Sequence, residues 1–91
     1  MASASTEVDA LFCAAWEAFC DLERLHHLAG EITYSREFAL QTAPPNATLE
    51  SMEAALAAAK AAEGEAKEAM DAAHHRFLEA DCARRAFYGF F

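Results

Sequence analysis

Two adjacent prolines, Pro44 and Pro45, divide the chain into two long stretches that contain no other proline. A proline lacks the amide hydrogen that a helix needs, and it pushes the preceding residue out of the α region. The break falls near the middle of the 91 residues, so the two stretches are similar in length. We therefore predict a turn over residues 43–47 and matched elements on either side of it.

The first stretch has the apolar spacing of an amphipathic helix. Its apolar residues recur alternately three and four positions apart, and they are Val8, Leu11, Ala15, Ala18, Leu22, Leu25, Ala29 and Ile32. Thr6 and Asp9 have the spacing of a capping box, in which a hydroxyl and an acid satisfy amides of the first turn. We predict a helix over residues 6–42, softened at Gly30, where glycine costs about 1 kcal/mol relative to alanine.

The second stretch predicts a helix over residues 48–88. Thr48 is the candidate N-cap, and Gly89 is the expected C-terminal stop. A heptad pattern runs without a break between them, through Leu49, Met52, Leu56, Ala59, Glu63, Ala66, Met70, Ala73, Phe77, Ala80, Arg84 and Phe87. Only Glu63 and Arg84 are not apolar.

One heptad position of this second helix holds alanine four times in succession, at Ala59, Ala66, Ala73 and Ala80. Small residues spaced by seven allow two helix backbones to approach closely. Alanine is also the best helix former, so the same stripe could reflect helix propensity alone. We favour close packing, and both interpretations predict a helix here.

The chain is thus expected to be all-α, a single domain over residues 1–91 that forms an antiparallel two-helix hairpin. Two helices form a seam and not a core. Residues 10–20 contain one polar side chain, Glu17, and a helix that is apolar nearly all round is buried on more than one side. We therefore expect the hairpin to complete its core by oligomerisation, as in a four-helix bundle.

Most of the aromatic residues lie toward the end of the hairpin that carries both termini, which is too many rings for one seam. We predict that this end binds a protein, either a second copy in a homodimer or a different protein. The terminal aromatics either fold back over Phe12 and Trp16 or dock on the partner. The candidate partner-binding residues are Leu11, Phe12, Trp16, Phe19, Phe87, Tyr88, Phe90 and Phe91.

Residue pairs that could carry chemistry are few. Glu23 with His26, and Asp71 with His74, have the spacing of carboxylate-bridged metal sites. The expected register places residue 16 opposite His74 and separates the two pairs by roughly 12 Å along the axis. Cys13 and Cys20 share a face near His74, but no close Cys/His spacing supports zinc. Phosphate-binding and nucleophile motifs are absent from the sequence. We predict no metal, no cofactor and no enzymatic activity.

The 15 acidic and 7 basic residues give a net charge of −8, which argues against direct binding to nucleic acid. Neither a signal peptide nor a membrane span is evident, and the odd number of cysteines predicts reduced thiols in the cytoplasm. The expected function is a non-enzymatic protein-interaction or assembly subunit. The alternative is a small acidic inhibitor that blocks a basic, nucleic-acid-handling site on a partner. A metal-binding helical bundle is the third possibility.

Overall fold

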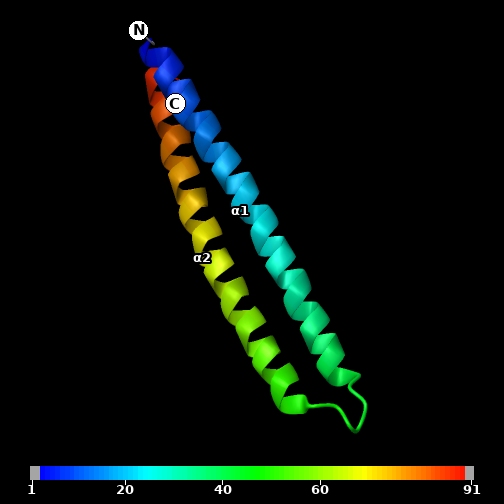
Figure 1. Cartoon of the computed structure of the whole chain (residues 1–91). Coiled ribbons are helices and arrows are strands. Elements are labelled where there is room, and N and C mark those ends of the chain that lie inside the picture. The colour runs from blue at the N-terminus through cyan, green and yellow to red at the C-terminus, as the bar shows by residue number, and fades with distance from the viewer. Residues whose placement is uncertain (1–2, 90–91) are drawn as a thin grey trace.

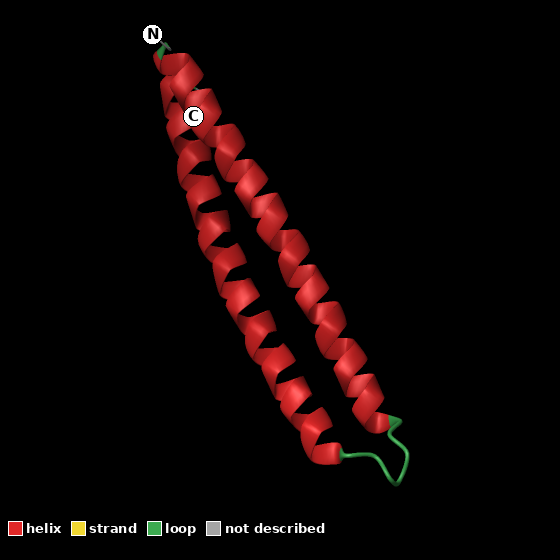
Figure 2. Cartoon of the chain, viewed as in Figure 1, coloured by secondary structure: helices red, strands yellow, loops and turns green. Residues whose placement is uncertain are grey.

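A computed structural model describes residues 3–89, and it consists of two long helices joined by a short loop (Figures 1 and 2). Helix α1 spans Ala4–Gln41 and helix α2 spans Leu49–Tyr88. The helices run antiparallel, so the start of α1 and the end of α2 lie together, opposite the loop (Figure 1). The predicted all-α hairpin is confirmed, and its turn contains both prolines.

The start of α1 differs from the prediction. The N-cap is Ser3, whose side chain accepts a hydrogen bond from the Thr6 amide at 3.3 Å. Thr6 therefore lies inside the first turn, and the capping box predicted at Thr6 and Asp9 is wrong. Ser3 is the stronger cap because its hydroxyl reaches that amide and also contacts the Thr6 hydroxyl at 2.9 Å.

The ends of α2 follow the sequence more closely. Thr48 is the N-cap, although its side chain makes no capping hydrogen bond. The carbonyl of Thr48 accepts a hydrogen bond from the Met52 amide at 3.4 Å, which is the first backbone hydrogen bond of the helix. Gly89 ends the helix with φ of 75°, a left-handed conformation that glycine adopts without strain.

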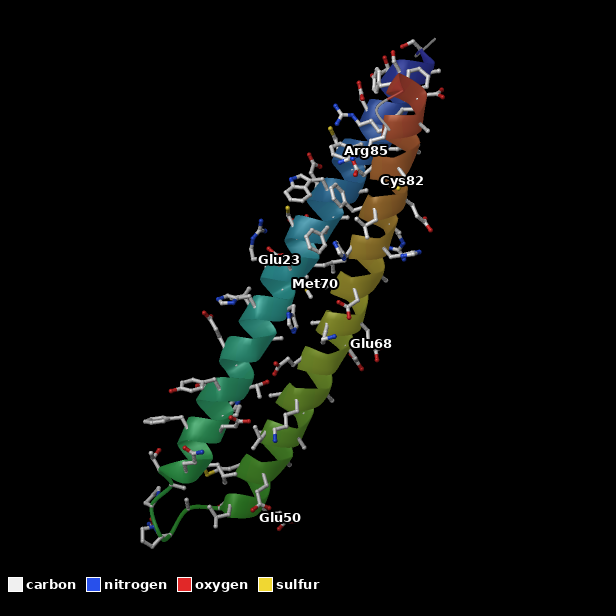
Figure 3. All side chains as sticks on the ribbon, turned by 180° about the vertical axis from the view of Figure 1, so that it is seen from behind. Glu23, Glu50, Glu68, Met70, Cys82 and Arg85 are labelled. Carbon is white, nitrogen blue, oxygen red and sulfur yellow. The ribbon has the colours of Figure 1, made fainter. Side chains whose placement is uncertain are left out.

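The seam contains the predicted row of α2 side chains. Ala59 and Ala73 are buried, with Ala73 only 2% exposed, while Ala66 and Ala80 are half-buried. Figure 3 shows Met70 on the side of α2 that faces α1, whereas Glu68 points away from it. The alanine stripe therefore lies where the two helices approach each other.

Only half of the α1 residues that we predicted to face α2 do so. Val8, Ala15, Leu22 and Ala29 are half-buried as expected, but the residues between them are shifted by one position. The structure turns Phe12, Phe19, His26 and Thr33 toward α2, and it leaves Leu11, Ala18, Leu25 and Ile32 exposed. Thr33 tolerates burial because its hydroxyl donates to the Ala29 carbonyl at 3.1 Å.

The register also differs slightly from the expected one. His74 packs against the ring of Phe19, with 5.1 Å between ring centroids, and not opposite residue 16. Asp9 meets Arg84, and Gly30 lies level with Glu63, so the same offset holds along the hairpin. These three pairs define which residues of α1 and α2 lie at the same level of the rod.

The hairpin is a rod with extents of 66 × 27 × 14 Å, one helix layer thick. Its radius of gyration is 20.0 Å, whereas a compact chain of this length has a value of about 12 Å. It exposes 6,687 Å², against roughly 5,200 Å² for a compact monomer of this mass. The large exposed area follows from the single layer, because every residue outside the seam faces solvent.

Candidate protein-interaction surface

The open end of the hairpin, where α1 begins and α2 ends, contains a cluster of rings around Phe77. The centroid of Phe77 lies 5.3 Å from that of Phe12, 5.1 Å from that of Trp16 and 6.4 Å from that of Phe19. Phe12 and Phe19 are half-buried by these contacts, and Trp16 is still 48% exposed. Much of the predicted aromatic surface is therefore used within the hairpin itself.

A polar group closes the same end. Arg84 Nε donates to Asp9 Oδ1 at 3.1 Å, and the Tyr88 hydroxyl donates to Asp9 Oδ2 at 2.9 Å. The Arg84 guanidinium also lies 4.6 Å from the ring centroid of Phe12. The hydrogen bond to Asp9 raises the pKa of Tyr88, because only the protonated phenol can donate to the carboxylate. This group explains why an arginine occupies a seam position.

One long side of the hairpin, which we call the polar face, is crossed by a hydrogen bond at one end and an ion pair at the other. On α1 it contains the heptad row of residues 9, 16, 23, 30 and 37, and on α2 the row of residues 60, 67, 74, 81 and 88. Asp9 and Tyr88 join these rows at the open end, and Lys60 Nζ lies 3.9 Å from Glu37 Oε1 near the loop. Trp16 belongs to this face.

The opposite long side, which we call the apolar face, is built from two other heptad rows. A groove between the helices shows that the rows share one side of the molecule, and it is lined by Val8, Leu11, Ala15, Arg76, Glu79, Ala80 and Ala83. The α1 row is Leu11, Ala18, Leu25, Ile32 and Ala39, and the α2 row is Ala55, Ala62, Ala69, Arg76 and Ala83. Arg76 is the only ionisable residue in these rows.

The bulky members of the apolar face are open to solvent. Leu11 is 68% exposed, Leu25 55% and Ile32 53%. Leu28 lies beside them on α1 and is exposed as well. By helical rise, Leu11 and Ile32 are about 31 Å apart, so the exposed apolar row runs along half of the rod.

The structure does not gather the predicted partner-binding residues on one surface. Leu11 lies on the apolar face, Trp16 on the polar face, and Phe12 and Phe19 in the seam. The exposed rings of Phe87 and Tyr88 pack edge to face, with 5.1 Å between centroids. Phe90 and Phe91, and hence the question of whether they fold back or dock, lie outside the described residues.

Sequence reasoning missed Leu25, Leu28 and Ile32 as surface residues. Leu25 and Ile32 were assigned to the seam because they fit a spacing of three and four. The available signal was that α1 has more apolar residues than one stripe holds, including Phe12 and Phe19 beside Leu11 and Ala18. A helix with two adjacent apolar stripes has a second side to cover.

The candidate metal ligands do not converge. Among residues 3–89, no group of three or more His, Cys, Asp or Glu side chains is placed to hold a metal ion. Glu23 and His26 line a shallow depression with Glu63, whereas Asp71 pairs with Lys67 at 3.0 Å and His74 packs on the ring of Phe19. Cys13, Cys20 and Cys82 are free thiols, and Cys13 and Cys82 are exposed.

Comparisons with protein-family models, curated proteins and solved structures give no match to this chain. Neither helix, over the residues that the structure describes, is long and apolar enough to cross a membrane.

Proposed function

We propose that this protein is a non-enzymatic assembly subunit that associates with further copies of itself through its apolar face. The observation that carries the proposal is the exposed row of Leu11, Leu25 and Ile32 on a rod that, among residues 3–89, buries only Thr33, Ala59 and Ala73. Contiguous exposed apolar patches beyond a few hundred Å² usually mark interaction sites.

The energetics favour covering this face. Burying one leucine or isoleucine side chain that was exposed contributes about 1.5–3 kcal/mol. The backbone of both helices is already ordered in the hairpin, so association orders mainly side chains. Nine of the ten residues in the two rows of the apolar face are uncharged in a chain of net charge −8, which keeps the desolvation cost of contact low.

The test is a charge placed on the apolar face and compared with the same change elsewhere. Leu25 is 55% exposed on the apolar face, and Leu78 is 45% exposed on the side of α2 next to the polar face. We expect sedimentation equilibrium to show that the wild-type chain associates and that Leu25→Glu is monomeric. Leu78→Glu should associate like the wild type, because its side chain lies outside the face.

A wild-type chain that stays monomeric at high micromolar concentration would contradict this function. Equal weakening by Leu25→Glu and Leu78→Glu would also contradict it, since association would then not depend on the apolar face. We place the protein in the cytoplasm, a proposal supported by its three free thiols.

A further inference from the structure

We infer that the partner on the apolar face is a second copy of this chain, placed with its open end beside the open end of the first. In this arrangement α1 of each copy packs against α2 of the other, around a two-fold axis parallel to the rod. The inference rests on the proposed function and specifies the partner and its orientation.

The sizes of the side chains carry the argument. The contacts of Asp9 with Arg84 and of Gly30 with Glu63 show which residues of α1 and α2 lie at the same level of the rod. At these levels, each long side chain in one row of the apolar face lies beside a small side chain in the other row. The pairs that lie within one residue of equal level are Leu11 with Ala83, Ala18 with Arg76, Leu25 with Ala69, and Ile32 with Ala62.

A two-fold axis along the rod preserves these levels and exchanges the helices. Leu25 of one copy then lies over Ala69 of the other, and Ile32 over Ala62, while Ala18 leaves room for Arg76. Each row supplies the side chains that fill the hollows of the row opposite, and the contact is repeated by symmetry. Such a self-complementary patch is what a two-fold interface requires.

In the reversed arrangement, large side chains meet in one helix pair and small side chains meet in the other. A two-fold axis across the rod would place α1 on α1 and α2 on α2. Leu11 would then meet Ile32 on one side of the bundle, and alanine rows would meet on the other. The two helix pairs would need different separations, because interaxial distance depends on the side chains at the contact.

Charge supports the same orientation. Among residues 3–89, Arg76 has no ion-pair partner, although it lines the groove on the apolar face. In the next α1 row outward, at residues 14, 21, 28 and 35, the one charged residue is Asp21, which also pairs with Arg24 of its own helix at 3.3 Å. With open ends together, Asp21 of one copy lies about one helical turn from the level of Arg76 of the other.

The exposed area fits a second copy of this size. Each hairpin exposes 6,687 Å², about 1,500 Å² more than a compact chain of its mass. Covering that excess on both copies buries roughly 3,000 Å², within the range of permanent homodimers.

Mixed single-cysteine chains test the orientation. All variants carry Cys13→Ser, Cys20→Ala and Cys82→Ser, so that the introduced thiol is the only one. Leu25→Cys chains are mixed with Ala69→Cys chains, oxidised mildly and run on a non-reducing gel. A second mixture of Ile32→Cys with Ala62→Cys guards against a local loss of packing at Leu25. Because each chain has one thiol, a covalent product joins two copies.

We expect both mixtures to give covalent dimers, and a mixture of Leu11→Cys with Ile32→Cys to give none. Cross-linking of Leu11→Cys with Ile32→Cys would show the reversed arrangement and overturn the inference, while association through the apolar face would stand. Failure of all three mixtures in chains that sediment as dimers would overturn it as well. Chains that sediment as monomers would overturn both the inference and the proposed function.

Discussion

Arg84 occupies a position of the α2 heptad that is otherwise apolar, and its contacts show how a cation is accommodated there. Its Nε is paired with Asp9 at 3.1 Å, while its guanidinium lies over the ring of Phe12. The stem of an arginine packs as an apolar chain when its charged head is satisfied. At residue scale, the open end of the hairpin is therefore closed by a polar group resting on a ring.

The hydrogen bond between Tyr88 and Asp9 gives a measurable signature. Because the Asp9 carboxylate raises the pKa of Tyr88, the phenol should ionise above the usual tyrosine value of about 10. The folded-state pKa is the higher one, so the stabilising contribution is present below the unfolded-state value and is lost as pH rises through the folded value. Absorbance titration at 295 nm in a Tyr34→Phe chain, which leaves Tyr88 as the only tyrosine, measures this pKa.

Asp9→Asn is the matched change for this titration. It removes the negative charge while keeping a hydrogen-bond acceptor, so the pKa of Tyr88 should fall toward the ordinary value. An unchanged titration curve in Asp9→Asn would show that the carboxylate does not hold the phenol in solution.

At the scale of the element, α2 was predictable from its sequence and α1 was only partly so. On α2 the predicted heptad row, which contains Ala59 and Ala73, is the buried one. On α1 two neighbouring rows are apolar, and hydrophobicity favours Leu25 and Ile32 over His26 and Thr33. Packing decides otherwise, because Phe12 and Phe19 meet Phe77 and because Thr33 satisfies its own hydroxyl. Spacing within one helix carries no information about such partners.

The alanine stripe of α2 gives a prediction at the same scale. Ala73 is 2% exposed against α1, so Ala73→Leu should overpack the seam and destabilise the hairpin by about 1–3 kcal/mol. Ala61 lies on the exposed outer side of α2, where Ala61→Leu should change stability little. Thermal unfolding followed by circular dichroism compares the two. Equal melting temperatures would mean that the stripe reflects helix propensity and not close packing.

At the scale of the whole molecule, the seam is the only interior of the rod that residues 3–89 form. If folding and association are coupled, the stability of the rod then depends on protein concentration. Ligands that bind only the native state raise the melting temperature by mass action, and the proposed second copy would act as such a ligand. We expect the melting temperature of the wild-type chain to rise with protein concentration, measured by calorimetry. That of Leu25→Glu should not rise, and Leu78→Glu should follow the wild type. A wild-type melting temperature independent of concentration would contradict this coupling.

The placement of both helix ends at one end of the rod has a mechanical consequence. A pulling force applied through residues 3 and 89 acts across the seam, so it loads the contacts one after another. The contacts of Asp9 with Tyr88 and Arg84 bear the load first, and the rings around Phe77 bear it next. Force applied between the open end and the loop acts along the helix axes instead, and the contacts of the seam then share it. The direction of the load therefore decides whether this hairpin unzips or holds.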